Sequence, residues 1–464
     1  MFHLYIVYIL YTAKLEDASK KEFAMKNNAL IKLFGNVGLS LEKINLLSVE
    51  TGFIKRYRKI KAAEFLVYMI SGAIGGCVSC NDLAAIIQTQ TGTMASRQAY
   101  HQKMNCACLQ FFEAILAVIM SFKTSTAIHS KFKCFKRILI QDSTVIKLPS
   151  KLMKVFSGVG NAHTQVCNAR IQSVFNLISG IFTQWSIDSY SKNDLLAAGE
   201  LAIEAGDMVL RDRGYFTATE CERIVGAKAD FISRYKHKTA LYDPQTGHEL
   251  DLLRLLDMQR TVDMDVVIGK DSQTRVRLIA VEVTQETAGR RRQKAKKECR
   301  GHNPSKEVLF LMGWTIFITS ITSREITADD FFELYGLRWK IETIFKTWKS
   351  HLSFDKIHIV SEIQLRLILI ARFIAISLFY EKIYNPLLQR VYRENRKIVS
   401  LMKLMRYISR NLSAIPRLLN AVSGSVKCLK FIEQYCIYDK RKRLNFIEKE
   451  LKILMTIEAI VNLN

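Results

Sequence analysis

Two aspartates and one glutamate stand in sequence settings that suit phosphodiester chemistry. Asp142 follows the apolar run 137–141, Asp212 follows the apolar run 208–211, and Glu342 lies in an amphipathic helical stretch. Three carboxylates that converge on hard, oxygen-seeking ions can hold two Mg²⁺ around a phosphodiester, and Mn²⁺ is expected to substitute. One ion would activate a water or a 3′-hydroxyl, and the other would stabilise the leaving oxygen. The three acids therefore predict a metal-dependent enzyme that cleaves or transfers phosphodiesters.

Glu342 shares its helical stripe with two cations and a phenol. In a single helix over 335–349, at about 100° per residue, Tyr335, Arg338 and Lys349 fall within roughly 40° of Glu342. Apolar residues gather on a separate flank that can be buried: Leu337, Ile341, Ile344 and Trp348. The stripe suits binding of phosphates beside a metal ion. Alternatively, it is a solvated face with an i,i+4 ion pair from Arg338 to Glu342, and Tyr335 could equally pack against the core.

Strand-like segments alternate with helices around the two aspartates. We expect strands at Arg137–Asp142, Met208–Asp212 and Phe231–Lys236, and a helix at about Asn193–Ala205. Two further strands within Ala169–Ile187 are joined by a hairpin at Ser179-Gly180. This order predicts an α/β fold, a mixed sheet with helices packed on it. Adjacent strands that end at one edge would bring the aspartates together, and a helix across that edge would deliver the glutamate.

Residues 240–310 interrupt this pattern as a β-rich insertion. Val262–Gly269 and Arg275–Thr284 alternate as antiparallel strands, and the basic run Arg290–Arg300 follows them. A charge run is usually a solvated face, but in a chain this basic we favour phosphate contact. DNA contacts are expected from Arg290, Arg291, Arg292 and Lys294. Leu309–Thr319 is expected to return to strand.

The flanking regions are predicted to be helical. Residues 25–130 form a region in which Ser96 can cap a helix that carries Arg97 and Lys103. Its helix–turn–helix spacing suits a DNA groove, although an ordinary helical hairpin explains the segment as well. Residues 361–464 form a helical C-terminal region, and residues 1–24 are interpreted as a possible upstream extension.

Charge is the unusual feature of the composition. The 464 residues include 68 basic and 43 acidic side chains, a net charge of +25, so a polyanion is the expected partner, either nucleic acid or an anionic membrane surface. The most apolar stretch, Ile363–Tyr380, contains Arg366 and Arg372 and is predicted to be a buried helix rather than a membrane span. Ten scattered cysteines indicate a reducing cytoplasm.

At these motifs the chain resembles DDE transposases of the insertion sequence 4 family. The resemblance rests on Gln-Asp142-Ser-Thr144, on Asp212-Arg-Gly-Tyr215, and on the signature Tyr-x2-Arg-x3-Glu-x6-Lys at Tyr335, Arg338, Glu342 and Lys349. It implies a ribonuclease-H-like core over 131–239 and 311–360, separated by the insertion. It further implies that the three acids bind the divalent metals, and that Tyr335, Arg338 and Lys349 contact phosphates of the DNA ends.

The resemblance also implies the reaction and the partners. Such an enzyme binds the inverted-repeat ends of an insertion sequence, cleaves them, in some members through a hairpin, and transfers the strands to target DNA. Double-stranded DNA is the expected partner of a homodimer in the bacterial cytoplasm, associated with the nucleoid, with no membrane or small-molecule partner. Two alternatives stay open: a metal-dependent nuclease without strand transfer, and a catalytically degenerate DNA-binding protein.

Overall fold

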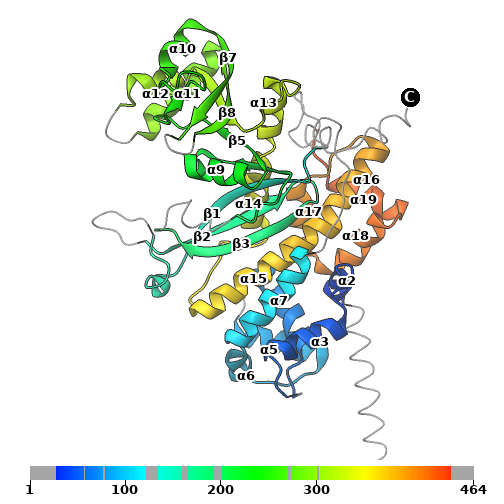
Figure 1. Ribbon diagram of the computed structural model, residues 1–464. Helices are drawn as coiled ribbons and strands as arrows, with labels where there is room; N and C mark the ends of the chain where they lie inside the picture. Colours follow the sequence, from blue (N-terminus) through cyan, green and yellow to red (C-terminus); the bar gives the residue numbers. More distant parts are fainter. Residues whose placement is uncertain are drawn as a thin grey trace, which may run out of the picture.

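The computed structural model describes residues 28–56, 58–76, 79–121, 134–158, 166–191, 201–269, 273–299 and 303–439. A nine-stranded sheet runs through the protein in the order β3-β2-β1-β4-β5-β9-β8-β7-β6. Figure 1 shows the N-terminal helices at one end and the helices of the insertion at the other. The strands are β1 (Arg137–Lys147), β2 (Asn168–Asn176), β3 (Ile181–Ser189), β4 (Asp207–Arg211), β5 (Asp230–Arg234), β6 (Leu241–Tyr242), β7 (Thr261–Ile268), β8 (Thr274–Glu282) and β9 (Trp314–Thr319).

The first five strands of the chain form one half of the sheet. β1, β2 and β3 are antiparallel neighbours, whereas β1, β4 and β5 run parallel. This mixed order, 3-2-1-4-5, is that of a ribonuclease-H-like core, so the predicted fold class is confirmed. The predicted strands in this half are all present.

The end of the β1–β4 ladder places the two aspartates. The parallel pairing stops at Gln141 beside Arg211, so Asp142 and Asp212 are the next residues on the two strands. The prediction that the first strand ends at Asp142 was wrong, because β1 continues to Lys147 along β2, with Asp142 opposite Ser173. Beyond Gln141, β1 is paired by β2 alone, because its pairing with β4 has ended.

The predicted hairpin between β2 and β3 is present. Gly180 lies in the turn with a φ of +67°, a conformation that a side chain disfavours. A Cβ at this position would lie 1.9 Å from Nδ2 of Asn385. The same amide donates to the carbonyl of Gly180 at 3.4 Å, so the turn is closed against the helices that follow the core.

The strands of the insertion extend the same sheet. β7 and β8 form the predicted antiparallel pair, and β8 pairs along β9. The connecting helices are α10 (Leu252–Met258), α11 (Gln285–Glu298) and α12 (Lys306–Leu311). The strand predicted at Leu309–Thr319 begins only at Trp314, because Ser305 caps α12 and carries the helix through Leu311.

Helices cover the faces and one end of the sheet. The N-terminal helices are α2 (Ala29–Gly35), α3 (Leu41–Glu50), α4 (Ala62–Gly75), α5 (Cys80–Thr91), α6 (Arg97–Lys103) and α7 (Cys106–Ser121). The helices of the core and the C-terminal region are α9 (Ala218–Gly226), α13 (Ala328–Gly336), α14 (Trp339–His351), α15 (Glu362–Phe379), α16 (Asn385–Asn395), α17 (Leu401–Arg410), α18 (Ile415–Val422) and α19 (Val426–Tyr435), with a π-helical turn at Tyr380–Tyr384. As predicted, Ser96 caps α6 by accepting from the backbone of Ala99 at 3.2 Å.

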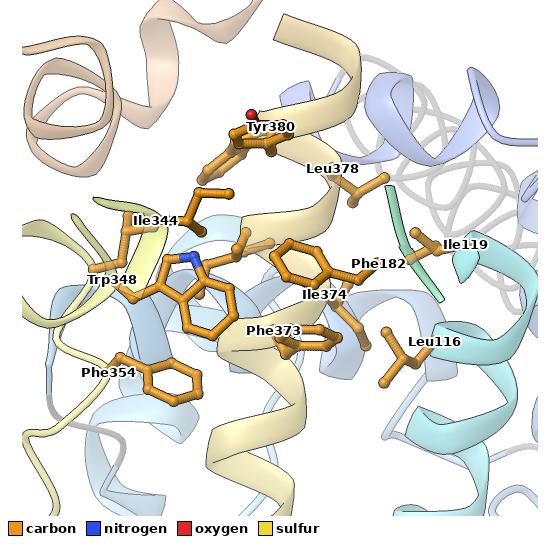
Figure 2. Packing of buried hydrophobic residues seen from close by; sticks show 14 of the residues in the cluster. Leu116, Ile119, Phe182, Ile344, Trp348, Phe354, Phe373, Ile374, Leu378 and Tyr380 are labelled. Atoms are coloured by element: carbon orange, nitrogen blue, oxygen red, sulfur yellow. The ribbon is translucent and has the colours of Figure 1, made fainter. Parts of the chain in front are cut away.

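Helix α15 runs through the larger of the two hydrophobic cores, and most of its residues are buried. The continuous helical stretch Glu362–Asn395 is long and apolar enough to cross a membrane, yet 83% of its most apolar window is buried inside the protein. The prediction of a buried helix at Ile363–Tyr380 is therefore confirmed. In Figure 2, Phe373 of α15 meets Phe182 of β3 and Trp348 of α14. The Trp348 ring lies 5.2 Å from that of Phe182 and 5.5 Å from that of Phe373.

Some predictions fall on residues that the structure does not describe. These are the N-terminal extension over 1–24, the last part of the predicted helical C-terminal region (440–464), and most of the helix predicted at Asn193–Ala205. The described remainder of that last segment, 201–205, is not helical. The cysteines of the described ranges are all free.

Candidate active site

The site forms where β1 and β4 separate. Asp142 is largely buried, and its Oδ1 accepts a hydrogen bond from the backbone N–H of Ser143 at 2.8 Å. Asp212 follows the last residue of β4 and is exposed. The negative charges of Asp212 and of Glu342 on α14 both act on Asp142 and raise its pKa. Sheet register and one helix thus bring the three predicted acids to one edge.

Glu342 lies on α14, the second of two helices, rather than on one continuous helix. The single helix predicted over 335–349 is divided into α13 and α14 by a turn at Leu337 and Arg338. The backbone N–H groups of these two residues donate to Leu334 and Tyr335, three residues back, as in a 3₁₀ turn. Gly336 lies directly before the turn. The expected apolar flank is present, and its four residues are buried: Leu337, Ile341, Ile344 and Trp348.

Arg338 bridges two of the acids. Its Nη1 donates to Oδ2 of Asp142 at 3.1 Å, and its Nη2 donates to Oε1 of Glu342 at 2.8 Å. The Arg338 side chain is 7% exposed, against 38% for Glu342. The i,i+4 ion pair with Glu342 is thus present, but its arginine is buried and also contacts the carboxylate of Asp142 on β1.

The protonation of Asp142 reflects this crowding. Burial raises the pKa of Asp142 from 3.8 to about 6; the Ser143 N–H and Arg338 lower it, and the negative charges of Glu342 and Asp212 raise it again. A carboxylate surrounded by other carboxylates is stabilised by a cation. Arg338 supplies one positive charge to the three acids.

The donor set fits a divalent ion, although the side chains are not arranged around one. Three carboxylates are the hard oxygen ligands that Mg²⁺ prefers. Within the described ranges, no group of three or more His, Cys, Asp or Glu side chains is placed to hold a metal ion. At this edge the guanidinium of Arg338 lies between Asp142 and Glu342. The chemistry of the residues fits, and the arginine occupies the space between two of them.

Tyr335 and Lys349 both donate hydrogen bonds to backbone carbonyl groups near the acids. The hydroxyl of Tyr335 donates to the carbonyl of Arg211 at 3.2 Å, and the side chain is buried. Lys349 Nζ donates to the carbonyl of Val145 at 2.8 Å, and burial lowers the pKa of Lys349. Tyr335 therefore packs against the core beside Asp212, and Lys349 fastens α14 to β1.

Further polar contacts hold the segments around Asp142 and Asp212 in place. Arg211, the residue before Asp212, forms an ion pair with Glu220 of α9. Tyr215 donates to Oε1 of Gln172 on β2 at 2.8 Å. Asp207, the acid at the start of β4, is fully buried and forms an ion pair with Arg137 at 2.5 Å. Its placement is that of a structural residue.

A basic cleft opens from the acid edge toward the insertion. It has a volume of about 820 Å³ and is lined by Asp212, Tyr335 and Arg338 on one side and by residues of α11 on the other. Its cations are Arg213, Arg234, Lys236, Arg291, Lys294 and Arg338. Such a cleft can hold phosphates next to the acids.

Several residues of this cleft were missed in the sequence. Arg213 lies two residues after β4, Arg234 is the last residue of β5, and Trp339 is 56% exposed at the start of α14. The signal for Arg234 was available, because parallel neighbours of the strand before Asp212 end at the same edge. The exposure of Trp339 could not be predicted from the spacing of a single helix, because the turn at Arg338 changes which side chains of α14 face outward.

The four cations predicted on the insertion divide between two roles. Arg291 donates to the carbonyl of Trp314 at 2.9 Å, and Arg292 donates to that of Leu309 at 3.0 Å. Arg290 and Lys294 are instead exposed, each in an i,i+4 ion pair. Thus α11 is held by one pair of arginines and presents the other two cations to solvent.

The N-terminal residues divide in the same way. Arg97 is exposed on α6. Lys103 donates to the carbonyl of Phe53 at 2.7 Å, and burial is the main cause that lowers the pKa of Lys103. A groove of about 1310 Å³ lies between α6 and the basic segment before α4, and its lining includes Arg56, Arg58, Lys59 and Lys103.

A ribonuclease-H-like core with three acids at one edge and a basic cleft beside them defines a DDE-type enzyme of DNA strand cleavage. The family described as "Transposase DDE domain" matches residues 133–378, more than half of the chain. The chain belongs to this family and is a DDE transposase, and the insertion sequence 4 signature fits.

Named relatives agree with this assignment. The transposase for insertion sequence element IS231D of Bacillus thuringiensis subsp. finitimus is 25% identical over 414 residues, 81% of this chain and 86% of that protein. The transposase for IS1151 of Clostridium perfringens is 26% identical, over 73% of this chain and 77% of that protein. Among solved structures, a piggyBac transposase synaptic complex with hairpin DNA covers 92% of this chain and 87% of that chain, with 10% identity and a TM-score of 0.40.

Proposed function

We propose that this transposase binds the inverted-repeat ends of an insertion sequence, cleaves them, and joins the freed strands to target DNA. Asp142, Asp212 and Glu342 hold the divalent ions, Mg²⁺ or Mn²⁺. The observation that carries the proposal is the bridge from Arg338 to Asp142 and Glu342 beside Asp212, because it brings three acids and a cation together at the mouth of a basic cleft.

The protein's own groups orient the reaction. When bound, divalent ions activate a water or 3′-hydroxyl and stabilise the leaving oxygen. Asp142 stays aligned because Ser143 and the sheet hold it, and Glu342 stays aligned because α14 is packed on the core. Arg338, Arg213 and Lys294 bind the phosphates that flank the scissile bond, and their positions fix its direction.

The cleft supports a path for the DNA end. Cations line it between Asp212 and α11, and they can neutralise the phosphates of a DNA backbone. Exposed Trp339 offers a face on which a nucleobase can stack. Among the residues predicted to bind DNA, Arg290 and Lys294 of α11 extend this surface.

The N-terminal groove supports a second DNA contact. Arg56, Arg58 and Lys59 line it, with Arg97 at the start of the neighbouring helix α6. A contact here would bind DNA away from the cleavage point, and it would give the enzyme its hold on the element end. Since two ends must be joined, the end complex is proposed to be a homodimer, acting on DNA in the bacterial cytoplasm.

A strand-transfer assay tests the proposal. The substrate is a labelled duplex from the DNA that flanks the gene, where short inverted repeats are expected, incubated with target DNA and Mg²⁺. Joined product supports a transposase that cuts and transfers. A product that is cut but never joined indicates a nuclease, and a bound, uncut duplex indicates a degenerate DNA-binding protein.

A further inference from the structure

The guanidinium of Arg338 uses the carboxylate oxygens that the proposed metal ion needs. We propose that Arg338 is an exchangeable counter-cation: it competes with the divalent ion for Asp142 and Glu342, and on exchange it moves to a DNA phosphate in the cleft. The inference rests on the proposed function, because it assumes that these acids hold the ion. It adds that the ion and the DNA favour each other's binding.

The contacts of Asp142 leave little room for both cations. Its Oδ1 accepts from the N–H of Ser143 at 2.8 Å, and its Oδ2 accepts from Arg338 at 3.1 Å. Glu342 keeps Oε2 free of the arginine, which is bonded to Oε1. An ion between the two acids would share Oδ2 of Asp142 with a guanidinium, and the two positive charges would repel each other.

The contacts of Arg338 stabilise its present position, but they do not satisfy every donor of its guanidinium. The guanidinium carbon lies 5.8 Å from the ring of Tyr335 and 5.6 Å from that of Trp339, within range of cation–π attraction. Its Nε is buried and has no hydrogen-bond partner among the described residues. A buried donor without a partner is destabilising, so part of the side chain is left unsatisfied in this position.

The alternative position lies next to the present one. Arg338 lines the basic cleft of about 820 Å³ together with Arg213 and Lys294. A phosphate there offers the planar guanidinium two oxygens, as the carboxylates do. Movement into the cleft therefore exchanges one anion for another, and it leaves two acids ready for the ion.

The consequence is a linkage between the two ligands. When a DNA phosphate binds Arg338, the affinity of the acids for the ion rises. By reciprocity, the bound ion raises the affinity of the protein for DNA. In the free protein the arginine holds the affinity for the ion low. The same residue thus limits metal-dependent chemistry until DNA is in place.

The test measures Mn²⁺ binding to the DNA-free full chain by the paramagnetic resonance signal of free Mn²⁺. Arg338→Gln is compared with Arg213→Gln, since both remove one positive charge from the cleft but only the first removes the bridge. We expect the Mn²⁺ dissociation constant to fall roughly tenfold in Arg338→Gln, the lower end of what a neighbouring charge does to a carboxylate. In Arg213→Gln it should fall much less. Equal effects in the two variants, or weaker binding in Arg338→Gln, would overturn the inference.

Two further variants separate this inference from the proposed function. Glu342→Gln should weaken Mn²⁺ binding; if it has no effect, the ion is not at these acids, and both proposals fail. If Glu342→Gln weakens binding while Arg338→Gln matches Arg213→Gln, only the exchange is wrong. Arg338→Lys retains the charge, but its ammonium cannot span both acids as the guanidinium does, so we expect an intermediate affinity even if Arg338→Gln folds poorly.

Discussion

Two buried aspartates at opposite ends of the β1–β4 ladder have opposite electrostatic surroundings. Asp207 begins β4 and forms an ion pair with Arg137 at 2.5 Å. Asp142 lies just past the end of the ladder, where burial raises its pKa to about 6. The first arrangement stabilises the fold, while the second costs stability in its charged form. Such a cost is common where a site is built to receive a cation.

The first prediction concerns the pH dependence of this cost. Because the folded-state pKa of Asp142 lies above 3.8, its contribution to stability is present at low pH and is lost as the pH rises through about 6. The difference corresponds to about 2 to 3 kcal/mol between these pH values. In chelator, Asp142→Asn should therefore raise the melting temperature at pH 7.5 but not at pH 4, as measured by circular dichroism.

Asp207→Asn is the matched control. It removes the buried carboxylate that pairs with Arg137 and leaves that arginine paired with the exposed Glu204; the loss of one member of a buried pair costs about 3 kcal/mol. This variant should melt earlier at pH 7.5. If Asp142→Asn also melted earlier at that pH, the assigned environment of Asp142 would be wrong.

At the scale of the elements, α14 must hold Glu342 against β1. Its apolar flank does so through Trp348, which packs between β3 and α15 in Figure 2. Its polar flank does so through Lys349 and the carbonyl of Val145. Both contacts fix the rotation of the helix, which decides where the glutamate points.

The second prediction separates two roles of Lys349. If it fastens α14 to β1, Lys349→Met should destabilise the protein by about 1.5 to 3 kcal/mol, the range for a hydrogen bond from a charged group. Cleavage should fall while DNA affinity changes little, as measured by melting, cleavage and gel-shift assays. A large loss of DNA affinity with unchanged melting would instead support the phosphate contact that the family signature implies.

The third prediction concerns the two faces of α11. Arg291→Gln removes bonds to Trp314 and to the hydroxyl of Thr315, so it should lower the melting temperature by several degrees. Arg290→Gln removes an exposed side chain, 70% accessible, and should leave melting unchanged. Equal melting of the two variants would contradict the assigned contacts of Arg291.

The elements differ in how far they could be predicted from the sequence. The strands around Asp142 and Asp212 follow from local apolar runs, and the ion pair of Arg338 with Glu342 follows from i,i+4 spacing. The continuation of β1 to Lys147 depends on pairing with β2, which lies beyond any local pattern. The turn at Arg338 likewise depends on packing, and so do the bonds that turn Arg291 toward β9.

At the scale of the whole molecule, two hollows are each lined by several cations. One is the cleft beside the acids, and the other is the N-terminal groove. The net charge of +25 could be inferred from composition, and with it a polyanion partner. Composition could not locate the two hollows, because each is lined by residues from segments far apart in the chain.

The fourth prediction is a change in salt dependence. Each phosphate contact contributes about 0.9 to the slope of log affinity against log salt. Replacement of Arg56, Arg58 and Lys59 by Gln should therefore reduce the slope for duplex DNA by about 2 to 3, as measured by fluorescence anisotropy. Substitution of Lys427 and Lys430 on α19, outside both hollows, should change it little. Equal slopes in both variants would contradict a DNA contact in the groove.

Glu342→Gln tests most directly whether the acids at the end of the β1–β4 ladder perform the chemistry. The variant keeps an oxygen that can accept from Arg338, so the fold and DNA binding should persist. In the strand-transfer assay with end DNA and Mg²⁺, both cleavage and joining should fall by about a thousandfold or more, while gel shifts match the wild type. Undiminished joining by Glu342→Gln would contradict the account.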